Sequence, residues 1–183
     1  SNLALFTSIR NHKHAFEISR KKVRQKRISY NGDLFKSLHM IFSAGDIEPG
    51  SDGFRKDIPL HRTYFHEINQ AKYIKDNMNE LIAWMNEEVS NKNLHPLSCA
   101  SKFHHKFMHV FPYQDTSGKV GRAVMNIYLM RNGYLPAIIH ATERQRYYEA
   151  IRNSHQDLAV LLVDSEMAAL DSAARFFRRI TRV

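Results

Sequence analysis

The sequence predicts an all-α domain with one small β-hairpin. Apolar residues recur at helical spacing along most of the chain, glycine and proline are few, and only one short stretch has an extended pattern. The chain has 183 residues, of which 43% are apolar and 11% aromatic, enough for one domain with a buried core. We expect a single domain over residues 1–183, with its core at about residues 34–170 and basic helical extensions at both ends.

Two long amphipathic helices are predicted in the middle of the chain. In residues 70–89, apolar side chains recur at intervals of three and four, which places them on one helix face: Ile74, Met78, Leu81, Ile82, Met85 and Val89. The stretch NKNLHP then interrupts the pattern. It starts again in residues 97–111, with an apolar face of Leu97, Ala100, Phe103, Phe107 and Val110. Both helices should pack into the core.

Residues 121–134 (GRAVMNIYLMRNGY) are apolar on nearly all sides of the expected helix, which predicts a central position. The helix should stop at Gly133, because glycine readily adopts the left-handed conformation that follows a helix end. Further helices are expected after Thr142, as an N-cap, and through residues 158–177. Residues 54–68 alone look extended, and a proline among them favours a short edge hairpin.

The formal net charge of +9 has much of its excess in two runs near the ends, Arg20–Arg27 and Arg175–Arg182. Clustered cations can bind nucleic acid by neutralising phosphates. Neither run, however, has the interleaved aromatics or the fold signature of a nucleic-acid-binding module. We therefore interpret both as solvated helix faces and expect no nucleic-acid partner.

The cysteine count and the hydropathy of the sequence indicate where in the cell the protein is expected. The single Cys99 excludes an internal disulfide framework and a cysteine-rich zinc site, and it fits a reducing compartment. The sequence has no run of eighteen apolar residues, and its beginning lacks the layout of a secretory signal. We expect no membrane span, and a location in the cytoplasm or, for a secreted effector, in the cytosol of a host cell.

The stretch HVFPYQDTSGKVGR, residues 109–122, lies between two of these helices and leads into the N-terminus of the central one. A helix N-terminus offers unpaired N–H groups and the positive end of the helix dipole, which suits a phosphate group. Asp115 could hold Mg²⁺ against phosphate oxygens, and cations follow at Lys119 and Arg122. The alternative is a polar, capped turn between helices. A Walker A loop fits poorly, since valine follows the glycine–lysine pair.

These residues resemble the signature of the Fic family, His-Pro-Phe-x-Asp/Glu-Gly-Asn-Gly-Arg-x-x-Arg, which aligns without gaps from Phe111 to Arg122. HPLSCASKFHHKF is similar to the helix that leads into this motif, MNIYLMRNGYLPAII to the helix after it, and RQRYYEAI to the next. Upstream, GFRKDIPL resembles the beginning of the family's flap hairpin. The resemblance covers about residues 34–170 and implies a Fic-type helical bundle with a small β-hairpin flap.

Membership in this family implies a reaction, the transfer of AMP or another phosphate-linked group from a nucleotide to a hydroxyl group of a protein. In that scheme the motif histidine is the general base, ATP is the nucleotide, and Asp115 holds Mg²⁺. The resemblance implies a phosphate-binding loop of Thr116, Ser117, Gly118, Lys119 and Arg122. It also implies a flap, which aligns the backbone of the target protein, at Leu60, His61, Arg62 and Thr63.

The chain departs from this signature at the catalytic position. Phe111 stands where the family has histidine, and phenylalanine cannot accept a proton, so a general-base contribution of about 10²–10⁴-fold is missing. Thr116 replaces a glycine, and Ser117 replaces the asparagine whose amide would bind phosphate. Lys119 keeps the charge of the first arginine without its bidentate geometry, whereas Arg122 keeps both. We expect weaker phosphate binding, but not its loss.

His109 is the nearest imidazole in sequence to the missing base. It precedes Phe111 by two positions, a rotation of about 200° on a helix, so it should face away from the site. His105 and His109 share a helix face, which raises a metal site as an alternative. Lys106 stands where a zincin would have glutamate, and no third ligand is evident, so packing or surface roles are favoured, also for His66.

Two functions of different classes remain open. The first is a Fic-like domain without catalysis, or with weak activity, that binds a protein partner and can also bind a nucleotide. The second is a working adenylyltransferase, or a related transferase of phosphate-linked groups, with another base or altered chemistry. Phe111 favours the first function.

Overall fold

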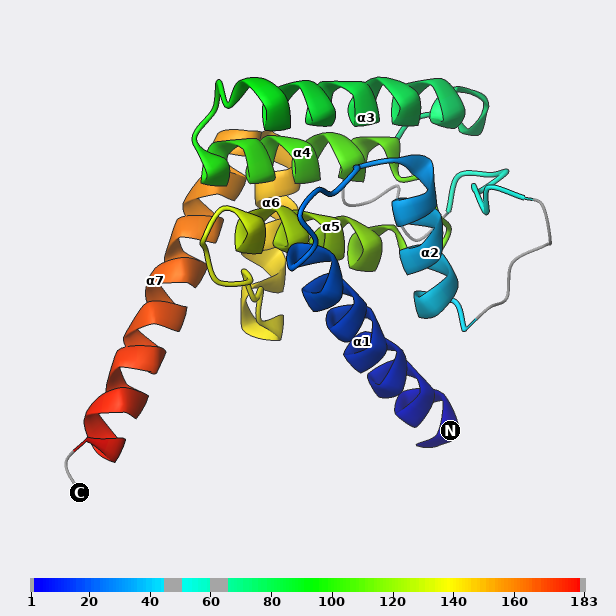
Figure 1. The fold of residues 1–183 in the computed structure, drawn as a ribbon. Coiled ribbons are helices and arrows are strands. Elements are labelled where there is room, and N and C mark those ends of the chain that lie inside the picture. Colours follow the sequence, from blue (N-terminus) through cyan, green and yellow to red (C-terminus); the bar gives the residue numbers. More distant parts are fainter. Residues whose placement is uncertain (1, 45–50, 60–65, 182–183) are drawn as a thin grey trace.

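The computed structural model describes residues 2–44, 51–59 and 66–181 (Figure 1). Along this part of the chain the elements are α1 (Asn2–Val23), α2 (Gly32–Phe42), the 3₁₀ turn η2 (Ala71–Tyr73), α3 (Ile74–Asn91), α4 (Pro96–Val110), α5 (Ser117–Arg131), the 3₁₀ turn η3 (Ala141–Glu143), α6 (Arg144–Asn153) and α7 (His155–Ile180). The predicted all-α fold is confirmed. No helix in the described ranges is long and apolar enough to cross a membrane.

The segment predicted as a hairpin is described only in part. Residues 54–59 and 66–68 form neither helix nor strand. The four flap residues taken from the family resemblance, Leu60, His61, Arg62 and Thr63, lie outside the described residues. The flap therefore stays a prediction, and only the chain on either side of it can be placed.

Capping residues fix where several helices begin. The side chain of Asn31 accepts a hydrogen bond from the N–H of Leu34 at the start of α2, at 3.1 Å. Ser154 caps α7 in the same way through the N–H of Asp157. Pro96 occupies the first turn of α4, where its missing N–H would have no acceptor within the helix.

The predicted N-cap of the sixth helix is wrong. Thr142 lies inside η3, and α6 begins after Glu143, which makes no side-chain cap bond. Because residues 141–143 form the 3₁₀ turn, the α-helix begins later in the chain than predicted. The predicted stop of α5 is confirmed, because the helix ends at Arg131 and Gly133 has a positive φ of 85°.

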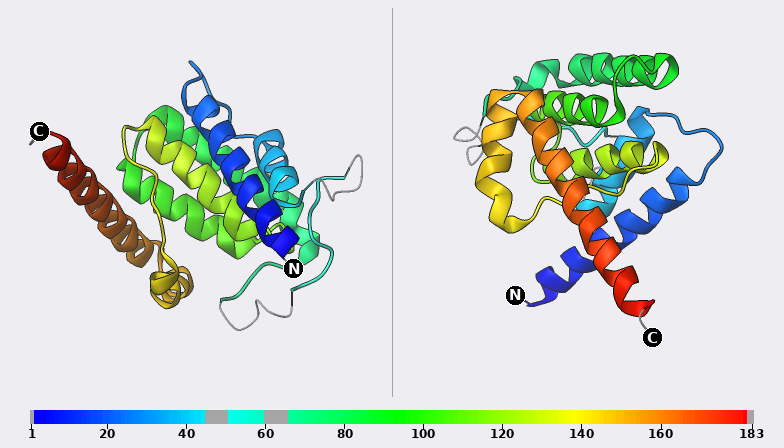
Figure 2. Two further views of the ribbon diagram at one scale, coloured as in Figure 1. Left: turned by 90° about the horizontal axis from the view of Figure 1, so that it is seen from below. Right: turned by 90° about the vertical axis from the view of Figure 1, so that its left-hand side faces the viewer.

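The central helix is α5, as its sequence predicts. It packs against α1, α2 and α4, while α3 covers the other side of α4 and α7 lies across the end of the bundle beside α6 (Figures 1 and 2). Side chains on several sides of α5 are buried, among them Val120, Val124, Met125, Ile127 and Leu129. Helix α1 lies before the expected core at 34–170, and its Ala15 is buried in the same cluster.

Helices α4 and α5 are in close contact at Gly121. A Cβ atom added there would lie 2.7 Å from Cδ1 of Phe107 and 3.0 Å from the ring of His104. Any side chain larger than hydrogen would push the two helices apart. Because these helices flank the motif loop, the contact at Gly121 fixes the start of α5 relative to the end of α4.

The first half of α1 and the second half of α7 extend from the same side of the bundle (Figures 1 and 2). The basic run at the end of α7 is exposed throughout residues 175–180. In the other basic run, α1 ends at Val23 and most of the cations are exposed. In the described residues most of these cations are exposed, but Arg24, Lys26 and Arg27 follow the end of α1, so the first run is a helix face only in its first part.

Candidate functional site

The motif loop joins the two core helices as the sequence predicts. Phe111 is the residue after α4, and Arg122 lies in the second turn of α5. Phe111 adopts a left-handed backbone conformation, with φ at 45° and ψ at 62°, which is uncommon for a residue with a side chain. Its ring is completely buried. The side chain of Phe111 therefore belongs to the core of the protein.

Arg55 holds this unusual turn in place from the chain before the flap. Its Nε donates to the carbonyl of Phe111 at 2.7 Å, and Nη2 donates to the carbonyl of Val110 at 3.3 Å. Nη1 reaches the carbonyl of Asp57 at 3.0 Å, and Nη2 also bonds the carbonyl of Asn69. The guanidinium is 5% exposed and lies at the C-terminus of α4, where the helix dipole favours a positive charge.

Backbone bonds reinforce this junction on both sides of the flap. The N–H of Arg55 donates to the carbonyl of Pro112, and the N–H of Asn69 donates to the carbonyl of His109, each at 2.8 Å. The residues before and after the predicted flap are thus both attached to the beginning of the motif loop.

Two of the predicted phosphate-binding residues turn their side chains inward. Oγ of Ser117 accepts from the N–H of Tyr113 and donates to its carbonyl, both at 2.7 Å. Oγ1 of Thr116 lies 2.7 Å from Nδ1 of His39, whose ring stacks on Tyr113 with centroids 4.0 Å apart. Both side chains are buried. Both hydroxyl groups are used in hydrogen bonds within the protein. Only the backbone of Thr116 and Ser117 is therefore left to bind a ligand.

His39 is held as a neutral hydrogen-bonding partner. Burial lowers its pKa, and a hydrogen bond with the backbone of Gly53 partly opposes that shift. Nδ1 of His39 and the hydroxyl of Thr116 share a hydrogen bond of 2.7 Å. This contact joins α2 to a loop that lies far away in the sequence.

Gly118 and Arg122 come together on the outer side of the same turn. A Cβ atom at Gly118 would lie 3.2 Å from Nη1 of Arg122, so the guanidinium rests against the first turn of α5. The N–H groups there have no acceptor within the helix. Lys119 and Arg122 also line a cavity of about 220 Å³ between α1 and α5. Asp115 is exposed and is not part of that lining.

The chain matches the model of the Fic/DOC family over residues 10–129. The chain belongs to this family. The loop just described lies within the matched residues, where the sequence resemblance predicts the family's motif loop with Phe111 at the histidine position.

Named relatives cover a smaller part of the chain. A protein adenylyltransferase Fic from Drosophila mojavensis is 40% identical over 73 residues, which are 40% of this chain and 14% of that protein. The protein of the same name from Drosophila melanogaster is 38% identical over 73 residues, or 15% of its length. The chain thus spans about one seventh of the length of these relatives.

Solved structures share the fold. A Fic domain-containing signaling protein from Bacteroides thetaiotaomicron superposes with a TM-score of 0.77, at 17% identity, over 92% of this chain and 73% of that one. Fic-1 from C. elegans gives 0.72 at 18% identity, over 91% of this chain and 49% of that one. At these identities the likeness supports the fold alone.

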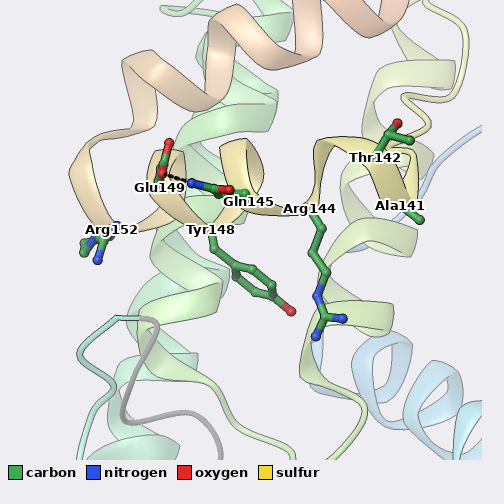
Figure 3. Close-up of a pocket in the computed structure, with 7 residues that line it drawn as sticks. All are labelled: Ala141, Thr142, Arg144, Gln145, Tyr148, Glu149 and Arg152. Carbon is green, nitrogen blue, oxygen red and sulfur yellow. Dashed lines mark hydrogen bonds between the residues drawn. The ribbon is translucent and has the colours of Figure 1, made fainter.

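A second cavity of this Fic domain, about 510 Å³, lies along α6 (Figure 3). Its lining is Ala141, Thr142, Arg144, Gln145, Tyr148, Glu149 and Arg152. Tyr148 and Arg144 extend to the same side of the helix, and the guanidinium carbon of Arg144 lies 5.6 Å from the centre of the Tyr148 ring. Gln145 and Glu149 are joined by a hydrogen bond of 3.0 Å.

This cavity is connected to the motif helix through Tyr147. The guanidinium carbon of Arg122 lies 5.8 Å from the centre of the Tyr147 ring, and the rings of Tyr147 and Tyr148 are 5.3 Å apart. An aromatic ring with cations beside it can stack on a planar base that carries phosphates. Sequence reasoning missed this cavity, although Arg144, Tyr148 and Arg152 recur at intervals of four residues.

His105 and His109 lie on the side of α4 that faces α3 and the chain around His66. His109 lines a cavity of about 450 Å³ between α3 and α4, and its Nδ1 bonds the carbonyl of His105 at 2.9 Å. Its ring is 4.4 Å from that of His105 and 5.3 Å from that of His66. The ring of His66 also lies 6.4 Å from that of Phe111, so it contacts both residues, and the orientation of His109 relative to position 111 stays a prediction.

Burial keeps the other histidines of α4 neutral. It lowers the pKa of His105 to about 4, helped by the neighbouring histidines. It lowers the pKa of His104 to about 3, helped by the charge of Arg122, and Nε2 of His104 bonds the hydroxyl of Tyr147 at 2.8 Å. In residues 2–44, 51–59 and 66–181 no three His, Cys, Asp or Glu side chains are placed to hold a metal ion.

Proposed function

We propose that this Fic domain binds a protein partner and holds a nucleotide at the start of α5, and that it lacks efficient AMP transfer. The observation that carries the proposal is Phe111, which stands at the position of the family's general base and is completely buried. A phenyl ring cannot take the proton from an incoming hydroxyl group, so that hydroxyl stays a weak nucleophile.

The imidazoles around the loop do not offer a substitute base. His39 bonds Thr116, His104 bonds Tyr147, and His109 bonds the carbonyl of His105. His39 and His104 are buried, and His109 belongs to the cavity between α3 and α4. Each of these rings is thus committed to a contact within the protein.

Nucleotide binding is supported by the outer side of the loop. The first turn of α5 offers backbone N–H groups, Gly118 has no side chain to cover them, and Arg122 and Lys119 supply positive charge. The base would stack on Tyr148 in the cavity along α6. Exposed Asp115 has the oxygen ligands that Mg²⁺ prefers, so it would hold the ion that accompanies ATP.

Protein binding is supported by the anchoring of the flap. Hydrogen bonds from Arg55 and Asn69 attach the chain on both sides of the flap to the motif loop. The family resemblance assigns the flap to the backbone of a target protein. These hydrogen bonds do not depend on a general base. A domain without the catalytic histidine would therefore still offer a surface to which an extended segment of a partner protein can bind.

An active transferase is the alternative, and the retained motif residues favour it. Asp115, Gly118 and Arg122 agree with the family signature, and the matched relatives are named protein adenylyltransferases. Such activity would need a nucleophile that reaches the site already deprotonated, or a base outside the loop.

Calorimetric titration with ATP and GTP, with and without Mg²⁺, tests the proposal. We expect ATP to bind, Mg²⁺ to strengthen binding, and Arg122→Ala to weaken it by about 10- to 100-fold, because a charge-assisted contact is lost. Arg175→Ala, on the exposed end of α7, is the matched control and should bind as the parent does. If neither nucleotide binds at millimolar concentration, the nucleotide part of the proposal is wrong.

A further inference from the structure

The outer face of α7 carries an apolar stripe with a regular spacing. Its members alternate at intervals of three and four residues: Val160, Val163, Met167, Leu170, Ala174 and Phe177. The five large side chains among them are between 43% and 64% exposed. A different face of α7, with the buried Leu158, Leu161 and Leu162, packs against the rest of the protein. Alternating intervals of three and four are the pattern by which one helix packs along another.

The stripe spans both the supported and the projecting parts of α7. The buried residues of α7 all lie between Leu158 and Glu166, in its first half, whereas its second half extends from the bundle (Figures 1 and 2). A partner that covers the whole stripe must therefore be long and narrow, with its own apolar repeat. A second α7 meets this requirement.

The stripe is complementary to itself when two copies run antiparallel. Val160 of one copy then lies opposite Phe177 of the other, Val163 opposite Ala174, and Met167 opposite Leu170. The three pairs share one midpoint, so a single two-fold axis brings all of them together, as a closed dimer requires. The small Ala174 leaves room for close approach, and the larger Phe177 meets a smaller valine.

Charges next to the stripe favour the same direction. An antiparallel arrangement brings Asp157, near the start of α7, close to Arg178 of the other copy. It also keeps the two basic ends apart, whereas a parallel pair would place residues 175–179 of both copies together. Asp164 and Asp171, beside the stripe, are each paired with an arginine of their own chain, Arg146 and Arg175.

The stripe itself argues against nucleic acid as the occupant, because nucleic acid has no apolar surface to cover six apolar side chains. We propose that two copies of this chain form an antiparallel dimer through the α7 stripe. The stripe covers fewer than three heptads, so we expect a dissociation constant in the micromolar range. This proposal does not depend on nucleotide binding.

Sedimentation of the 183-residue chain across micromolar concentrations tests the dimer. The mass should rise from 21.4 kDa toward twice that value as concentration increases. Leu170→Glu should weaken association by at least about 100-fold, because a carboxylate would be buried against Met167 of the other copy. Ser172→Glu is the matched control, since this side chain is exposed on the same helix and is not part of the stripe. Circular dichroism should show unchanged helix content in both variants.

Cysteine cross-linking tests the direction and the register. Val163→Cys and Ala174→Cys should form a disulfide when the two variants are mixed under oxidising conditions, and neither should cross-link well alone. The native Cys99 is completely buried and should not interfere. The proposal is overturned if the chain stays monomeric throughout, if Leu170→Glu associates as the parent does, or if each single variant cross-links with itself in preference to the other.

Discussion

The inner and outer sides of the motif loop differ in what their residues do. On the inner side, Phe111, Thr116 and Ser117 are buried and contact other parts of the protein. On the outer side, Asp115 is exposed, and Lys119 and Arg122 are half-buried beside a cavity. The three inner residues are those that depart most from the family signature. The outer residues keep their charge.

On the proposed function, this difference separates two roles within one loop. Phe111, Thr116 and Ser117 serve as packing and hydrogen-bonding groups, which stabilise the loop. Residues that attract an anion remain where a ligand could reach them. Three experiments can break or sharpen this comparison.

Replacement of Arg55 should have the largest effect. Arg55→Met removes a buried cation that donates to the carbonyls of Phe111, Val110 and Asp57, so these groups lose their partners. We expect the free energy of unfolding to fall by about 3–5 kcal/mol. Urea denaturation measures it. Arg175→Met, in an exposed ion pair, should change it by less than about 1 kcal/mol. If the two substitutions changed the free energy of unfolding equally, Arg55 would not be the residue that stabilises the turn at Phe111.

Loss of the Ser117 hydroxyl should have an intermediate effect. Ser117→Ala leaves the buried N–H and carbonyl of Tyr113 without this partner. We expect a loss of about 1–2 kcal/mol in the free energy of unfolding, with nucleotide affinity within about twofold of the parent. Ser172→Ala, exposed on α7, is the control. If Ser117→Ala instead lost nucleotide binding strongly at unchanged stability, the Ser117 hydroxyl would contact the ligand and not the backbone of Tyr113.

Near neutral pH the smallest effect is expected, from the buried histidines. The folded-state pKa values of His39, His104 and His105 lie below the ordinary value of 6.5, so the unfolded chain binds protons more readily. Their contribution to stability is present above pH 6.5 and is lost as the pH falls toward the folded-state values.

Denaturation at several pH values between 7 and 4 measures this dependence. His105→Asn should reduce the slope, since it removes a group whose folded-state pKa is about 4. His140→Asn, on the exposed chain before η3, should leave the slope as it is. A stability that rises on acidification would show that these rings are charged in the folded protein.

Local patterns in the sequence predicted most of the fold. The periodicity of residues 70–89 and 97–111 placed α3 and α4, and the apolar surface of α5 predicted its central position. The motif alignment placed Phe111 and Arg122 at the ends of the right helices. The predicted N-cap at Thr142 was wrong because a threonine before a helical pattern does not show whether a 3₁₀ turn lies between it and the helix.

Contacts between distant segments could not be predicted in this way. Arg55 is one of 27 cationic side chains, and nothing local shows that it lies at the end of α4. His39 and Thr116 are 77 positions apart and meet only in the folded chain. The same holds for the cavity along α6, whose residues have helical spacing but no signature of their own.

The central claim is that this Fic domain lost its base and kept its ligand side. The most direct test incubates the domain with Mg²⁺ and ATP labelled in its α-phosphate, and follows label on the domain itself and on added proteins. We predict no transfer by the parent or by Phe111→Ala, and the appearance of label with Phe111→His, provided circular dichroism shows that the variants are folded. Transfer by the parent at a rate that Phe111→Ala leaves unchanged would contradict the account.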